Sequence, residues 1–163
     1  MKTVVMLTKV FFEGHPRAGQ TTNFADSVRA GKKIHTCRDN AGYWTKKIET
    51  LKATGGTLSV REWQDKPYRS PQVVIADYPA TEVGTSELTM TRYQHRVEPY
   101  RHSITCYRAT VDGKPVEIEE LAKNDGFTRA QDFTAFIAPL FDKYHSDTIT
   151  LAIIHFNKYR YGV

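Results

Sequence analysis

The chain has 163 residues, with 23 lysines and arginines against 18 acidic residues, a formal net charge of +5 and 12% aromatic residues. This length suits one domain with a hydrophobic core and is short for two domains. A basic, aromatic-rich composition fits a nucleic-acid or nucleotide partner, although a charge of this size is also an ordinary solubilising charge. No apolar stretch approaches the roughly 18 residues of a membrane span.

The two cysteines, Cys37 and Cys106, stand alone and have no histidine spacing that would complete a zinc site. Lone cysteines in a chain without a signal peptide are typical of reduced, intracellular proteins. We therefore predict a single cytoplasmic domain over residues 1–163, with no metal, no cofactor and no membrane partner. Nothing in the sequence sets the oligomeric state, and a monomer is assumed.

The N-terminal third is predicted to contain a strand, a short helix and a longer helix. The strand covers Thr3 to Phe12, which is rich in β-branched and aromatic residues. The short helix has Asn23 as its N-cap and Gly31 as the left-handed residue after its end. The longer helix begins after Asn40, places apolar residues at helical spacing, and stops at Gly55.

The run from Ala30 to Arg38 gathers basic and titratable side chains directly after the short helix. The members that can meet a phosphate or a polar base edge are Lys32, Lys33, His35 and Arg38. Thr36 and Arg38 lie two residues apart, so their side chains share one face of a strand. Since a guanidinium is a preferred partner of phosphates and base edges, this run predicts a ligand-binding segment.

A hairpin is predicted from residues 57–63 and 72–76, whose patterns are typical of strands. The loop between them contains two prolines and presents Lys66, Tyr68 and Arg69. Together with Arg61 and Trp63 at the end of the first strand, these residues interleave cations with aromatic rings. Alternating cations and aromatic rings can stack bases, so we treat Arg61, Lys66, Tyr68 and Arg69 as a second binding candidate; alternatively, the loop is only a packed corner.

Two further strands are predicted over Glu87 to Tyr93 and Ser103 to Val111, with a turn at Asp112-Gly113 and a very short return strand because of Pro115. The basic, aromatic segment from Tyr93 to His102 has no strand periodicity. We interpret this segment as an irregular surface crossover, with a lid or a nucleic-acid contact as alternatives.

The C-terminal third is predicted to hold two helices and a buried strand. The first helix covers Pro115 to Asn124. The second starts with a capping box at Thr128, and its apolar stripe consists of Phe133, Phe136, Ile137, Leu140 and Phe141. The strand covers Thr148 to Phe156, where His155 is interpreted as a core histidine. These elements predict an α+β fold with a bent, mostly antiparallel sheet that closes toward a barrel with flanking helices.

Two short motifs resemble the ASCH domain, a small β-barrel of the PUA-like superfamily. The first is a helix followed by Gly31-Lys32-Lys33 and Thr36-x-Arg38, and the second is residues 125–128 (Asp-Gly-Phe-Thr) followed by a helix and the last strand. The resemblance frames residues 24–156 and implies a PUA-like barrel with RNA or a modified nucleoside as its partner.

Some ASCH proteins are small amidohydrolases that act on acetylated cytidine, and the resemblance carries their lysine, threonine and acid onto Lys33, Thr36 and Asp125. The family enzymes have glutamate where this chain has the shorter Asp125. In these roles Lys33 is the base, Thr36 the nucleophile, and Asp125 positions the lysine or the leaving group. Alternatively, Thr36 is an ordinary strand residue, Lys33 a solvated side chain and Asp125 an acid that assists the start of a helix.

Three functions therefore stay open from the sequence. The first is binding of RNA or a modified nucleoside in a basic cleft, and the second is hydrolysis of an acetylated nucleoside such as acetylcytidine. The third is a non-catalytic adaptor or mobile-element accessory protein. A cavity that desolvates Lys33 would favour the enzyme, whereas an open basic groove from Arg38 to Arg69 would favour polymer binding.

Overall fold

The computed structural model describes residues 1–99 and 102–162, whose strands form two sheets. The smaller sheet has the order β1-β3-β4, with β1 parallel to β3 and β3 antiparallel to β4. The larger sheet has the order β2-β8-β5-β6-β7, and all its pairs are antiparallel. The strands are β1 (Lys2–Leu7), β2 (His35–Arg38), β3 (Thr57–Trp63), β4 (Gln72–Pro79), β5 (Gly84–Val97), β6 (His102–Val111), β7 (Lys114–Val116) and β8 (Thr148–His155).

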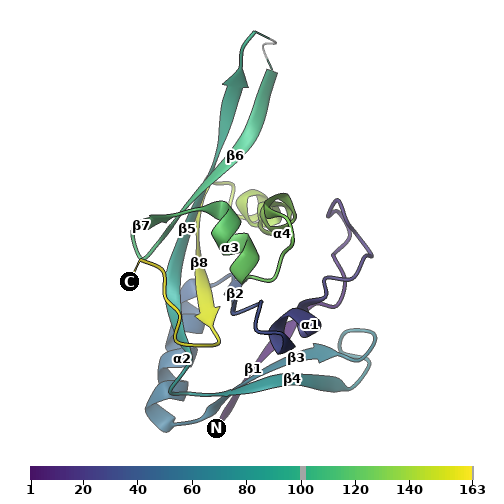
Figure 1. Ribbon diagram of the computed structural model, residues 1–163, viewed down its shortest axis with the longest axis vertical. Coiled ribbons are helices and arrows are strands. Elements are labelled where there is room, and N and C mark those ends of the chain that lie inside the picture. The colour runs from purple at the N-terminus through teal and green to yellow at the C-terminus, as the bar shows by residue number, and fades with distance from the viewer. Residues whose placement is uncertain (100–101, 163) are drawn as a thin grey trace.

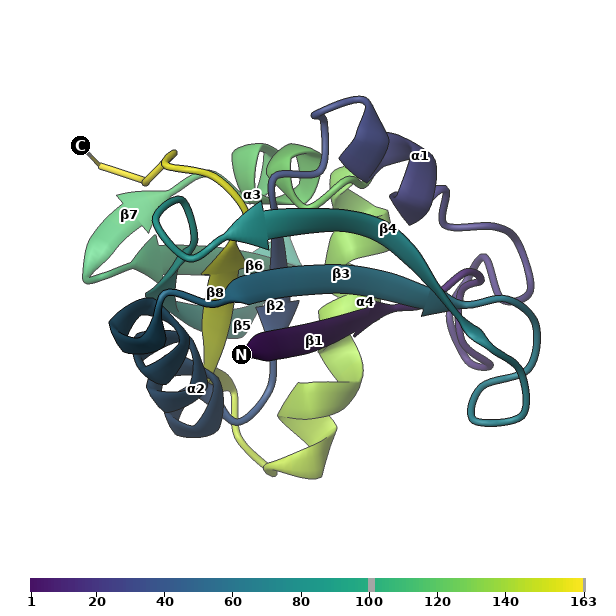
Figure 2. The ribbon, with the colours of Figure 1, turned by 90° about the horizontal axis from the view of Figure 1, so that it is seen from below.

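The two sheets lie as separate layers whose strands cross, as Figure 2 shows from the side of the smaller sheet. A contact between them is the stacking of Tyr78 from β4 on Phe156, with ring centroids 5.4 Å apart. The predicted α+β class and the mostly antiparallel pairing are confirmed. The predicted barrel is wrong, because the described strands pair only within each sheet and the sheets do not close on each other.

The four helices are α1 (Phe24–Arg29), α2 (Ala41–Thr54), α3 (Ile118–Asn124) and α4 (Ala130–Lys143). The amphipathic pattern of α4 is confirmed, since Phe133, Ile137 and Phe141 are buried. Phe136 is only half-buried. The predicted capping box at Thr128 is wrong because the N-cap residue is Arg129, which makes no side-chain cap. Among the described residues, no helix has the length and apolar character needed to cross a membrane.

Several predicted boundaries also need correction. The first strand ends at Leu7 rather than Phe12. Pro115 belongs to β7 rather than to a helix, because this strand lies at the edge of the sheet, where a missing N–H removes no ladder bond. The segment 93–102 is not a crossover: its described residues continue β5 to Val97 and begin β6 at His102, while Tyr100 and Arg101 lie outside the described residues.

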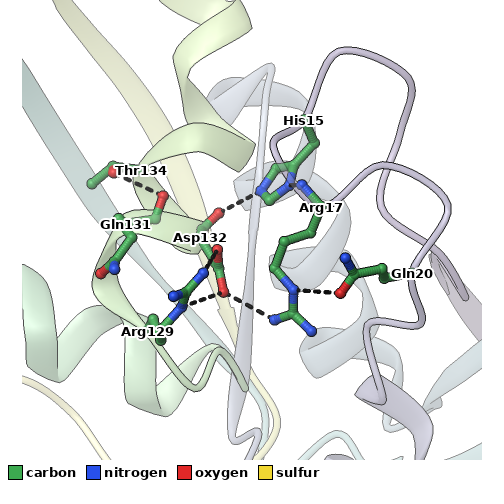
Figure 3. Close-up of polar contacts among 7 residues, drawn as sticks. All are labelled: His15, Arg17, Gln20, Arg129, Gln131, Asp132 and Thr134. Carbon is green, nitrogen blue, oxygen red and sulfur yellow. Dashed lines mark hydrogen bonds and ion pairs between the residues drawn. The ribbon is translucent and has the colours of Figure 1, made fainter.

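The long loop of residues 8–23 is fastened to the N-terminal end of α4, as Figure 3 shows. The buried carboxylate of Asp132 accepts a hydrogen bond from Arg17 Nη1 at 3.0 Å. His15 Nε2 lies 2.9 Å from the backbone oxygen of Asp132. Phe12 packs on Phe136, with ring centroids 5.3 Å apart. The loop therefore packs against Phe136, and Phe136 in turn lines a cavity between α1, β2 and α4.

Candidate functional site

A cavity of about 140 Å³ lies where β1, β2, α1, α4 and the connection from α3 to α4 meet. Its lining combines a polar group with aromatic walls. The polar residues are Lys33, Thr36, Cys37, Arg38 and Asp125. The aromatic residues are Phe24, Phe127 and Phe136. The three residues that the ASCH resemblance singles out, Lys33, Thr36 and Asp125, therefore line one cavity although 92 positions separate the first from the last.

The backbone around Lys33 is fixed by the end of α1 and by the connection after α3. Lys33 N donates to the carbonyl oxygen of Ser27 at 3.0 Å, and Ile34 N donates to that of Asn124 at 2.9 Å. Gly126 has a φ of +87°, and a Cβ atom at this position would lie 2.9 Å from Lys33 Cβ. Glycine is required at position 126 both for this backbone conformation and for the close approach of the lysine.

The Lys33 side chain is 2% exposed and forms a buried ion pair with Asp125. Lys33 Nζ donates a short hydrogen bond to the Asp125 carboxylate and a second one, of 2.6 Å, to the Asp125 carbonyl oxygen. The same nitrogen lies 4.2 Å from the centre of the Phe24 ring. The ammonium group is thus held by one acid, one carbonyl and one aromatic face, all with little access to water.

Burial pushes both members of this pair toward their neutral forms. It lowers the pKa of Lys33 from its ordinary value of 10.5, and the attraction of Asp125 only partly opposes this shift. Burial likewise raises the pKa of Asp125, against the attraction of Lys33 and Arg38. A lysine with a lowered pKa loses its proton more readily than a solvated lysine, which is the direction that a general base requires.

Asp125 does not lie at the start of a helix. It is the residue that follows the last turn of α3, whose C-terminal end disfavours a negative charge. The interpretation of Asp125 as an acid that assists a helix start is therefore wrong. Because Asp125 is 4% exposed, its ionised form depends on the cations and hydrogen-bond donors around it.

The Thr36 side chain is 3% exposed and lines the cavity from the middle of β2. Among the described residues, none forms a hydrogen bond with its hydroxyl group. The hydroxyl therefore remains available to a ligand in the cavity. Thr36 is thus both a strand residue and a residue that lines the cavity. The interpretation of Lys33 as a solvated side chain is wrong, because Lys33 is buried.

Cys37 and Arg38 complete the polar side of the cavity. Cys37 Sγ lies within 4.8 Å of the Asp125 carboxylate, and burial raises the pKa of this thiol well above its ordinary value. The Arg38 guanidinium donates to the backbone oxygens of Met6 and Cys37. Arg38 therefore connects β2 to β1. Two of the N–H groups that were predicted to bind phosphate already donate to backbone oxygens. No motif or spacing indicated Cys37 as a site residue, and its only signal was its place beside Thr36.

The structure separates the other predicted binding residues from the cavity. His35 is fully buried, with Nε2 2.6 Å from the Tyr161 hydroxyl, and burial lowers its pKa well below 6.5. Lys32 is exposed and lines a different, open hollow with Lys123. Neither Lys32 nor His35 lines the cavity, although a ring nitrogen of His35 lies within 4.8 Å of the polar atoms of Cys37 and Asp125.

The second binding candidate lies on the β3–β4 hairpin and does not reach the cavity. Arg61 donates to the Ser59 hydroxyl at 2.8 Å and to Gln72 at 3.0 Å. The loop residues Lys66, Tyr68 and Arg69 are exposed, and none of the four predicted residues lines the cavity. The cavity lining therefore does not form the open basic groove from Arg38 to Arg69 that would favour polymer binding.

One group in the described chain has the donor types of a metal site. The ligand atoms of His35, Cys37 and Asp125 lie within 4.8 Å of one another. These types suit zinc, but Lys33 Nζ already contacts the Asp125 carboxylate and occupies an acceptor that a metal ion would need.

Comparison with known proteins assigns no family to this chain. No family model matches it, and neither a curated protein nor a solved structure gives a significant match.

Proposed function

We propose that this protein hydrolyses the amide bond of a small acylated nucleobase or nucleoside, with acetylated cytidine as the model substrate. The observation that carries the proposal is the buried Lys33–Asp125 pair beside the Thr36 hydroxyl in one cavity. The similarity of these residues to the lysine, threonine and acid of ASCH amidohydrolases supports the same chemistry.

In the proposed reaction, neutral Lys33 takes the proton of the Thr36 hydroxyl while Thr36 Oγ1 bonds to the acyl carbon. The resulting Lys33 ammonium then gives that proton to the leaving amine as the amide bond breaks. Water hydrolyses the acyl ester of Thr36, with Lys33 again accepting and returning a proton. Asp125 holds Lys33 in place and stabilises its protonated form between the steps.

The cavity suits a small planar group better than a polymer. A cavity of about 150 Å³ accommodates a ring the size of benzene, and the cavity here measures about 140 Å³. Phe24, Phe127 and Phe136 offer faces and edges that can pack on a planar, acylated base. We propose that the acylated end of the base enters and that a ribose stays outside.

Binding of RNA or a modified nucleoside without chemistry is the second candidate. The exposed Lys66, Tyr68 and Arg69 favour it, because cations and an aromatic ring are available there for phosphates and bases. Binding without turnover of an acetylated nucleoside would support this candidate over hydrolysis.

The decisive pair of variants is Thr36→Val and Thr36→Ser. Valine keeps the branched shape on β2 but has no hydroxyl, whereas serine keeps the nucleophile. We expect wild type and Thr36→Ser to release cytidine from acetylcytidine and Thr36→Val to release none, with all three equally folded by circular dichroism. Equal activity of Thr36→Val and wild type would contradict the proposal.

Asp125→Glu tests the departure from the family pattern. Asp125 already contacts Lys33 Nζ, so an added methylene must move the carboxylate away from its position or push the lysine out of place. We expect glutamate to lower hydrolysis rather than to improve it, since a displacement of about 1 Å in a catalytic group can cost roughly a hundredfold in rate. An increase in activity would show that the shorter acid is a handicap.

A further inference from the structure

The strands β5 and β6 extend beyond the body of the protein as a two-stranded arm (Figure 1). On one side β8 accompanies β5 only as far as Thr91, and on the other side β7 accompanies β6 only from Ala109. The pairing of β5 with β6 continues from Arg92↔Tyr107 to Val97↔His102. Arg92 N still donates to the backbone oxygen of Asp147 at 2.9 Å. From Tyr93 to Val97, over roughly 16 Å at a rise of about 3.3 Å per residue, no third described strand pairs with the arm.

The composition of this arm is that of a polyanion-binding element. Residues 91–108 contain four arginines and two histidines against one acidic residue, Glu98. Arg92 is paired with Asp142 and Asp147 of the body, and Arg96 Nε lies 3.0 Å from the exposed Glu98 carboxylate, a pair that a phosphate or a base edge can replace. An isolated two-stranded ribbon is only marginally stable in water, so a long exposed one gains stability from a partner. Positive charge on such an arm favours nucleic acid as that partner.

The register places hydrogen-bonding side chains together on one face of the arm. Gln94 is paired with Thr105 and Arg96 with Ser103. Gln94 Nε2 donates to Thr105 Oγ1 at 3.0 Å, and all four side chains are exposed. The opposite face carries Tyr93, Ile104 and the exposed His95, which is paired with Ile104. Arginine and glutamine are the side chains that read guanine and adenine edges in the major groove.

We propose that the β5–β6 arm docks in the major groove of double-stranded DNA, with Gln94 and Arg96 facing the base edges. The B-form major groove is about 12 Å wide and admits a two-stranded β-ribbon. The deep, narrow major groove of an A-form RNA duplex does not admit such an element. The arm lies outside the cavity lining, so this inference does not depend on the proposed hydrolysis.

The test compares Arg96→Ala with Lys46→Ala in the full chain. Each variant removes one exposed positive charge, but Lys46 lies on α2 at the other end of the molecule. Binding to a fluorescent DNA duplex, to the RNA duplex of the same sequence and to single-stranded DNA is measured by anisotropy over a series of salt concentrations. Thermal unfolding confirms that both variants are folded.

We expect wild type to prefer the DNA duplex and Arg96→Ala to bind it roughly tenfold more weakly, with Lys46→Ala close to wild type. The salt dependence of Arg96→Ala should stay close to that of wild type, because a contact to a base edge releases no counterion from a phosphate. Three results would overturn the proposal: no DNA binding at low salt, equal affinity of Arg96→Ala and Lys46→Ala, or equally tight binding of the RNA duplex or the single strand. An arm-dependent dimer without DNA affinity, seen by light scattering, would instead assign the arm to a second copy.

Discussion

Breaking the buried Lys33–Asp125 pair should cost far more stability than removing the pair as a whole. Asp125→Asn leaves a buried lysine that can escape its charge by losing a proton. From its ordinary pKa of 10.5, this costs about 5 kcal/mol at pH 7, at roughly 1.4 kcal/mol per pH unit. Lys33→Met leaves a buried carboxylate that can take up a proton from its ordinary pKa of 3.8, at a cost of about 4 kcal/mol. These values are upper limits for the single variants.

The double variant Lys33→Met/Asp125→Asn contains neither charge, so it should be more stable than either single variant. The single variants also differ in the sign of their pH dependence. Without Lys33, burial keeps the pKa of Asp125 above its unfolded value, so stability is full below about pH 4 and is lost as the pH rises. Without Asp125, burial keeps the pKa of Lys33 below its unfolded value, so stability increases as the pH rises toward 10.5.

Urea unfolding of the four proteins between pH 4 and 9 measures both effects. The exposed pair of Lys143 and Asp39, with atoms 2.7 Å apart, provides the control, since Lys143→Met should change the unfolding free energy little. Additive losses in the double variant, or single variants with the stability of the control, would refute the claim that these two charges are buried against each other.

Three further expectations concern residues around the site. Burial lowers the pKa of His155 from 6.5 to about 3. The contribution of neutral His155 to stability is therefore full above pH 6.5 and is lost as the pH falls toward 3. His155→Gln should flatten this acid limb of the stability profile by up to about 1.4 kcal/mol per pH unit. Unchanged acid denaturation of that variant would contradict this. Gly126→Ala should lower both hydrolysis and the melting temperature, because the new Cβ meets Lys33 and the backbone there has positive φ. A variant as active and as stable as wild type would show that the Lys33 side chain can move away from the added methyl group. Asp132→Asn should increase proteolysis within residues 8–23, because the buried side chain that accepts from two arginines loses its charge. An unchanged cleavage pattern would show that the aromatic contacts alone hold the loop.

The sequence predicted well the elements whose periodicity is local. The stripe of Phe133, Ile137 and Phe141 required only helical spacing, and Gly31 and Gly55 marked helix ends because they adopt positive φ. The strand pattern of 57–63 was equally clear. Sheet closure is different, because it depends on long-range pairing that periodicity does not encode. The barrel was therefore predicted but two separate sheets were found.

The candidate site was predictable only in part for a similar reason. Lys33 and Thr36 are close in sequence, but the cavity also needs Asp125, which the fold brings in from the end of α3. His35 lies in the same basic run, and no local signal indicated that it is buried against Tyr161. The arm was missed because exposed strands carry no apolar alternation, and polar residues from 93 to 97 therefore look irregular.

The most direct measurement of the proposed chemistry is a search for an acyl group on Thr36. Acetylcytidine is mixed with the protein, the reaction is quenched with acid at short times, and the peptide that contains β2 is analysed by tandem mass spectrometry. We expect one acetyl group on Thr36 in wild type, far less in Lys33→Met because the base that activates Thr36 is missing, and no acetyl group in Thr36→Val. Turnover of the substrate with no acetyl group on Thr36 at any time, or with the label on Cys37 instead, would contradict the assignment of the nucleophile.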